Sequence, residues 1–148
     1  MKTWVPKKED LLAPRKWYVV DAKDVLLGRL CTRVANVLTG KNKPTFTPHA
    51  DMGDHVVVVN ASEVKLSGSK LSDKKYYTHA RQPGSLKEMS AGRKLRRFPE
   101  RMIEDSVRGM LPKNKLGRKM IKKLKVYRGS DHPHSAQKPE VVNVGDLR

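Results

Sequence analysis

Residues 55–60 (HVVVVN) constrain the fold more than any other part of the chain. Four consecutive β-branched residues favour a strand, because their side chains suit the pleated surface of a sheet. A strand with one face in water alternates apolar and polar residues, and this stretch does not. It therefore predicts a strand buried on both faces, which is typical of a parallel sheet covered by helices.

The residues before this strand supply the rest of a βαβ unit. Residues 16–21 (KWYVVD) are rich in β-branched and aromatic side chains and predict a strand. A helix is expected next, capped by Asp24 and ended by Gly40, and a basic loop follows at residues 41–48. The apolar stripe of this helix comprises Leu27, Leu30, Cys31, Val34 and Leu38. With 148 residues, the chain is expected to form a single α/β domain.

The middle of the chain is rich in turn-forming and basic residues. Residues 64–66 and 76–78 flank a Gly/Ser/Lys stretch at 67–75. The pattern leaves open whether these two segments pair as a projecting hairpin or form separate extended pieces. Pro83 and Gly84 predict a turn, and the basic segment that follows them is compatible with a short helix.

Residues 99–129 predict two helices separated by a turn. Pro99 suits the first turn of a helix whose apolar face carries Met102, Ile103, Val107 and Met110. Pro112 ends this helix, and we expect Gly109 and Gly117 to allow close backbone approach to a neighbour. Leu116, Met120, Ile121 and Leu124 then recur at helical spacing, with Lys and Arg between them. Residues 125–127 predict a last strand.

The charge of the chain is strongly positive and unevenly distributed. Lys and Arg number 32 against 15 Asp and Glu, and residues 61–128 hold +14 of the net charge of +17. Such a surface attracts polyanions, above all nucleic acid. Few aromatic residues disfavour base stacking on single strands, so folded RNA is the better target. Membrane binding is disfavoured, because no basic helix also carries Trp or Phe and no apolar run is long enough to span a bilayer.

Catalytic and metal-binding patterns are absent from the sequence. One cysteine and five histidines lack zinc-type spacing, and residues 35–42 fail the phosphate-binding loop signature at Ala35 and Asn42. Glu104 and Asp105 are adjacent on a predicted helix and point in different directions. An RNA-modifying α/β enzyme is the alternative function, but it would need a glycine-rich cofactor loop at a strand end. We therefore expect no catalytic residue, cofactor, metal or small-molecule substrate.

Several motifs, in order along nearly the whole chain, carry a family resemblance. They are WYVVDA (17–22), LGRL (27–30), DHVVVVNA (54–61), VRGMLP (107–112), LGR (116–118), YRG (127–129) and HPH (132–134), with Ala136, Gln137 and Pro139. With these motifs the chain resembles the family of large-subunit ribosomal protein L13 in its bacterial form.

The resemblance implies a three-layer α/β/α domain around a small, mostly parallel sheet, with basic loops and extended termini. The termini are an arm at residues 1–14 and an irregular tail at 129–148. It also implies a cytoplasmic, non-enzymatic ribosomal component that binds 23S-type ribosomal RNA, contacts neighbouring large-subunit proteins and acts early in assembly. Translational control outside the ribosome is known for relatives in the family but has no signature here.

The residues expected to bind the RNA come from the basic clusters and from the two histidines of the tail. They are Lys74, Lys75, Arg93, Lys94, Arg96, Arg97, Lys113, Lys115, Arg118, Lys119, Lys122, Lys123, Lys125, Arg128, His132 and His134.

Overall fold

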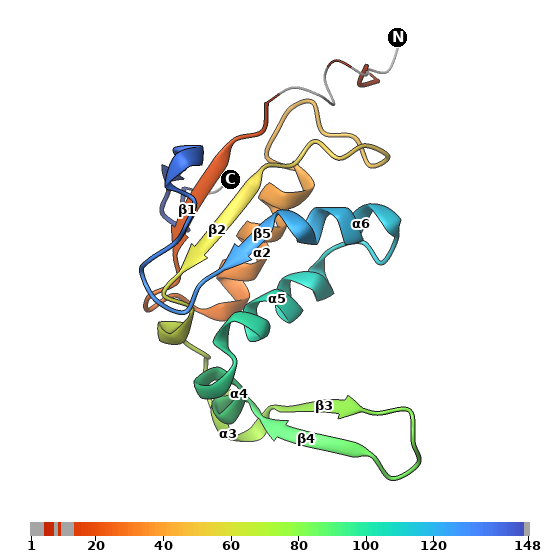
Figure 1. Cartoon of the computed structure of the whole chain (residues 1–148), viewed down its shortest axis with the longest axis vertical. Coiled ribbons are helices and arrows are strands. Elements are labelled where there is room, and N and C mark those ends of the chain that lie inside the picture. The colour runs from red at the N-terminus through yellow and green to blue at the C-terminus, as the bar shows by residue number, and fades with distance from the viewer. Residues whose placement is uncertain (1–4, 8, 10–13, 147–148) are drawn as a thin grey trace.

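The computed structural model describes residues 5–7, 9 and 14–146, and it is built on a four-stranded parallel sheet (Figure 1). The strands are β1 (Trp17–Asp21), β2 (His55–Val59), β5 (Leu124–Val126) and β6 (Glu140–Val141), in the order β5-β2-β1-β6. Most of the arm predicted at residues 1–14 lies outside the described residues.

Strand β2 is buried on both faces, as its run of valines predicts. Val56, Val57 and Val58 have no exposed surface. Val56 and Val58 face the main core, whereas Val57 packs with Val19 and Val59 on the opposite face. Complete burial of a valine side chain contributes about 1.5–3 kcal/mol, so this strand anchors the whole domain.

Helices α2 (Leu27–Thr39) and α5 (Pro99–Met110) cover one face of the sheet (Figure 1). Gly40 ends α2 as predicted, with a φ of +84° and its N–H donated to the carbonyls of Asn36 and Val37. The predicted cap at Asp24 is wrong, because Leu26 occupies that position without a side-chain hydrogen bond. A bridge between Leu26 and Lys65 fixes the helix start instead, and Asp24 pairs with Lys65 at 2.7 Å.

The C-terminal tail packs against the other face of the sheet. His134 lies 5.2 Å from Trp17, ring centre to ring centre, and the short 3-10 helix Ser135–Gln137 follows it. The predicted α/β fold around a mostly parallel sheet is therefore confirmed, with helical segments on both sides. The tail is more regular than predicted, because β6 pairs with β1 and Val142 donates its N–H to Val19.

A two-stranded hairpin projects away from the sheet (Figure 1). It pairs β3 (Lys75–His79) with β4 (Leu86–Ser90), and its loop contains Gly84 at a φ of +75°. Helices α3 (Lys70–Asp73) and α4 (Ala91–Arg97) form its base. Residues 76–78 thus pair with residues 87–89, while residues 64–66 form a separate extended piece after the 3-10 helix Ala61–Glu63.

The second helix of the basic stretch is shorter than its apolar spacing predicts. Helix α6 spans Lys115–Met120, and a 3-10 turn, Ile121–Lys123, leads directly into β5. Leu124 pairs with Val56 in the sheet and so does not belong to the helix. Pairing of the chain with a buried strand overrides the local helical pattern here.

Candidate nucleic-acid interface

Helix α6 is held closely against the turn that precedes it. Asn114 caps the helix, with its side-chain oxygen accepting the N–H of Gly117 at 2.8 Å. Gly117 is buried, and a Cβ at this position would collide with the carbonyl oxygen of Pro112. Gly109, by contrast, has nothing within 4 Å of a built Cβ, so no described residue packs closely against it.

Helix α6 and the segments that flank it carry a set of exposed basic residues, which we call the α6 face. Its members are exposed, and the described residues provide none of them with an ion pair. They are Lys113, Lys115, Arg118, Lys119, Lys122, Lys125 and Arg128. Seven cations without acidic partners leave a strong positive potential at this surface.

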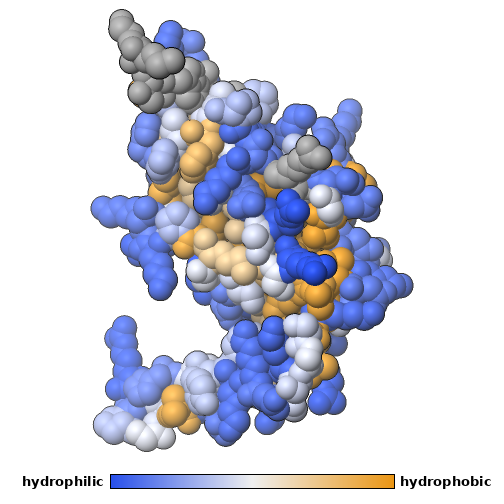
Figure 2. All heavy atoms as spheres, turned by 180° about the vertical axis from the view of Figure 1, so that it is seen from behind, coloured by the Kyte–Doolittle hydropathy of each residue, from blue (hydrophilic) through white to orange (hydrophobic). Residues whose placement is uncertain are grey.

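A second exposed basic cluster lies on α4, at the base of the hairpin. It comprises Arg93, Arg96 and Arg97. The guanidinium of Arg128 donates to the backbone carbonyl of Arg96 at 3.3 Å, which joins this cluster to the end of the α6 face. Figure 2, which shows the molecule from behind, has hydrophilic residues over much of the hairpin and the flanks of the body.

Three lysines predicted with these clusters differ in their surroundings. Lys74 and Lys75 are exposed, although Lys75 pairs with Glu88 at 3.3 Å. Lys94 has only 13% of its side chain exposed. Its ammonium lies 2.8 Å from Asp105 and 3.9 Å from the ring centre of Tyr76, so it ties α4 to α5 and to the hairpin. We therefore assign Lys94 a structural contact.

Lys123 is directed into the protein. Its ammonium donates to the carbonyl of Leu38 at 2.9 Å and to the carboxylate of Asp51, and the residue is buried. Burial lowers the pKa of Lys123, and the negative charge of Asp51 opposes this shift. The adjacent Lys122 is exposed, so a 3-10 turn separates the two neighbours onto opposite sides. An interior ammonium cannot reach an RNA phosphate, and Lys123 does not belong to the α6 face.

The two histidines of the tail pack on the second face of the sheet. Nε2 of His134 lies 2.8 Å from the hydroxyl of Tyr127, and the ring of His132 is 6.3 Å from that of His134. Loss of solvent lowers the pKa of His134, and the nearby charges of His132 and Lys125 lower it further. His134 holds the tail against Tyr127 and Trp17.

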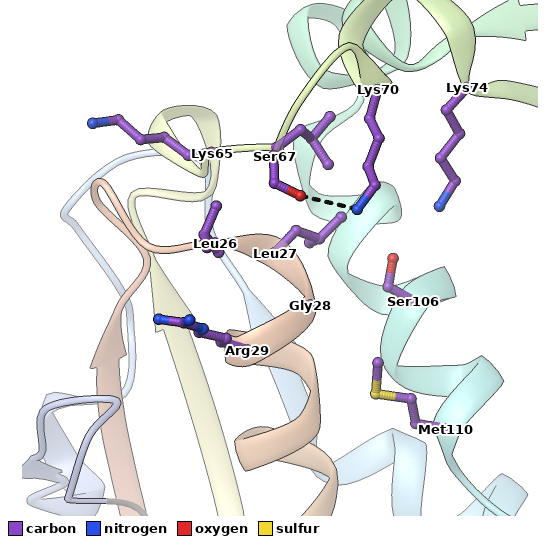
Figure 3. A pocket seen from close by; sticks show the side chains of 11 residues that line it. Leu26, Leu27, Gly28, Arg29, Lys65, Ser67, Lys70, Lys74, Ser106 and Met110 are labelled. Carbon is purple, nitrogen blue, oxygen red and sulfur yellow. Dashed lines mark hydrogen bonds between the residues drawn. The ribbon is translucent and has the colours of Figure 1, made fainter.

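A cavity of about 530 Å³ opens between the start of α2, the segment around α3, and α5 (Figure 3). Arg29, Lys65, Lys70 and Lys74 line it together with two serines. No local sequence pattern predicts this grouping, because Arg29 and Lys70 are far apart in the chain and neither belongs to a dense basic cluster.

The part of the chain that the structure describes shows little sign of metal binding, thiol reactivity or membrane spanning. No group of three or more His, Cys, Asp or Glu side chains there is placed to hold a metal ion. Cys31 is buried, and burial raises the pKa of its thiol to about 12. Within the same residues, no helix has the length and apolar character needed to cross a bilayer.

Comparison with known proteins identifies the family of the chain. The family model described as ribosomal protein L13 matches residues 15–133. The large ribosomal subunit protein uL13 of Citrifermentans bemidjiense is 56% identical over 97% of this chain and 100% of its own length. The uL13 protein of Brevibacillus brevis is 61% identical over 88% of this chain and 90% of its own length. The chain belongs to the ribosomal protein L13 family.

Proposed function

We propose that the protein is a structural constituent of the large ribosomal subunit, where it binds 23S-type ribosomal RNA and supports early assembly. Its relatives are named as large-subunit proteins, and the family consists of structural ribosomal components rather than enzymes. One observation carries the mode of binding: seven exposed cations on the α6 face lack ion pairs with other described residues.

The α6 face suits the RNA backbone for two physical reasons. Each Lys or Arg that neutralises a phosphate releases condensed counterions, which favours binding at low salt. A helix held by the contact between Gly117 and Pro112 presents its cations in a fixed arrangement, so less conformational entropy is lost on binding. Sequence-independent contacts of this kind recognise folded RNA by its shape and backbone.

The proposed RNA-binding set keeps the exposed members of the sequence-based set and omits Lys94, Lys123, His132 and His134. It comprises Lys74, Lys75, Arg93, Arg96, Arg97, Lys113, Lys115, Arg118, Lys119, Lys122, Lys125 and Arg128. Neighbouring large-subunit proteins are the second class of partner that we propose. Exposed Tyr77 and Leu86 on the projecting hairpin, each about 60% exposed, support this.

Co-sedimentation tests this function. We expect the full chain to remain with the large subunit through a high-salt wash and to bind protein-free 23S-type RNA at low salt. Recovery in the free fraction, with no affinity for that RNA, would contradict the proposal. Micromolar binding of a nucleotide or methyl-donor cofactor would favour an RNA-modifying enzyme instead.

A further inference from the structure

The cavity at the start of α2 has the character of an anion site (Figure 3). Its lining includes four Lys or Arg residues, and no Asp or Glu from the described part of the chain lines it. Its remaining walls are two serines, Gly28 and apolar side chains. A concave space with cations and no carboxylate favours a negatively charged occupant.

Lys70 of α3 and Lys74, which follows the helix, are directed into this cavity, whereas Lys65 and Arg29 point away from it (Figure 3). The ammonium of Lys70 donates to the hydroxyl of Ser67 at 2.9 Å. The ammonium of Lys74 lies 5.2 Å from the ring centre of Tyr76 and forms no ion pair with another described residue. Two neighbouring ammonium groups without a counterion repel each other, and an anion between them relieves this repulsion.

The size and the walls of the cavity favour a piece of RNA backbone over a bare ion. A volume of about 530 Å³ is within the range of small-molecule ligand pockets and far exceeds the size of a phosphate group. Leu27 and Met110 provide apolar walls that suit a ribose. Ser67 accepts a hydrogen bond from Lys70 and keeps its own hydrogen to donate to an anionic oxygen.

The backbone at the mouth of the cavity is also accessible to a ligand. Gly28 lines the cavity, and a Cβ built on it would meet nothing within 4 Å. It lies in the first turn of α2, which has no acidic residue and no side-chain cap. A ligand phosphate here therefore meets no carboxylate among the described residues that line the cavity.

We propose that this cavity receives one phosphate, with its ribose, from the backbone of the bound ribosomal RNA. Lys70 and Lys74 bind the phosphate, and Ser67 donates its hydroxyl hydrogen. The site lies outside the α6 face, and of these three residues only Lys74 belongs to the set expected from sequence. The inference rests on the proposed function, because it names a further contact to the same RNA.

Substitution of Gly28 tests the electrostatic part of the proposal. Gly28→Asp fits the open space and places a carboxylate at the first turn of a helix, where it favours folding. We expect it to weaken binding of 23S-type RNA about tenfold while leaving the thermal midpoint at or above that of the parent. The isosteric control Gly28→Asn should bind nearly as well as the parent. Equal binding by the two variants overturns the proposal.

Removal of the two lysines tests the same contact independently. In the full chain, Lys70→Gln with Lys74→Gln should reduce the magnitude of the log–log salt slope of RNA binding by about 0.7–0.9, the contribution of one phosphate. The matched control, Lys16→Gln with Lys23→Gln, removes the same charge at the ends of β1 and should leave the slope near the parent value. Equal slopes for the two double variants contradict a phosphate contact in the cavity.

Amide NMR signals of Gly28 and Ser67 identify the source of the phosphate. A 23S-type RNA fragment that the protein protects from nuclease should shift both signals in the parent and not in the lysine double variant. Shifts with inorganic phosphate but not with this fragment would indicate a free-phosphate site and overturn the proposal. Tight RNA binding with unchanged cavity signals would overturn the inference alone, whereas no RNA binding by the parent would overturn the proposed function as well.

Discussion

Gly117 packs directly against the carbonyl oxygen of Pro112, and this contact sets the position of α6 against the preceding turn. We expect Gly117→Ala to force the helix away from the turn, because the added methyl group meets backbone that cannot move freely. The cost should be about 1–3 kcal/mol of unfolding free energy, as for overpacking elsewhere. Urea denaturation measures this loss, and RNA affinity should fall with it.

Gly109→Ala is the matched control for this prediction. Gly109 lies in α5 with nothing within 4 Å of a built Cβ, so alanine should raise helix stability by up to about 1 kcal/mol. Equal effects of the two substitutions would show that the contact between Gly117 and Pro112 does not position α6.

Substitution of Lys123 should lower the free energy of unfolding far more than substitution of Lys122. Lys123→Met leaves the carboxylate of Asp51 without its buried partner and removes the hydrogen bond to Leu38. We expect a loss of about 3 kcal/mol in the free energy of unfolding. Lys122→Met, at an exposed position, should change it by no more than about 0.5 kcal/mol. Similar denaturation midpoints for the two variants would place Lys123 at the surface.

This pair also shows what the sequence can predict and what it cannot. The run of valines at 56–59 specifies a buried strand, since no half-exposed strand is apolar at every position. Gly40 and Pro99 likewise mark the end of α2 and the start of α5, because their backbone preferences are local. Lys122 and Lys123 are identical in type and adjacent, and only the 3-10 turn into β5 determines which of them meets solvent.

Contacts between distant segments account for the remaining differences. Leu124 fits a helical pattern but pairs with Val56, and Asp24 fits a cap but binds Lys65. The cavity at α2 unites residues 26–29 with residues 65–74 and with α5, a grouping that no local period reveals. The charge and the motifs of the chain thus predict a polyanion partner, whereas tertiary packing decides which cations are available to it.

Protonation of His55 should reduce stability at mildly acidic pH. Its ring stacks on Trp17 at 4.2 Å, and its pKa is lowered first by burial and then by the charges of Lys123 and Arg15. Above a pH of about 6.5 the histidine is neutral in both states; below it the unfolded chain gains the proton first. The thermal midpoint should therefore fall as the pH drops from 7 toward 5. The variant His55→Phe keeps an aromatic ring, so its thermal midpoint should fall less over the same pH range. An identical pH profile of the midpoint for parent and variant would contradict the assignment.

Affinity for 23S-type RNA should depend steeply on salt. Each phosphate contact contributes about −0.7 to −0.9 to the slope of log affinity against log salt. We expect a slope steeper than about −4, because the α6 face alone offers seven cations that no described residue pairs with. Filter binding across a salt series measures it. A slope near zero would mean that contacts other than ion pairs with phosphate hold the RNA.

We propose that the exposed cations of the α6 face bind ribosomal RNA. Arg118→Ala with Lys122→Ala removes two of them from the surface, and Lys16→Ala with Lys23→Ala removes the same charge elsewhere as a control. Exposed charges contribute little to stability, so both double variants should unfold within about 2 °C of the parent.

The decisive measurement is the affinity of these two double variants for 23S-type RNA at one fixed salt concentration. We expect the α6 variant to bind roughly tenfold or more weakly than the parent, while the control variant stays close to it. Parent-like binding by the α6 variant, or an equal loss in both variants, would show that these cations do not hold the RNA.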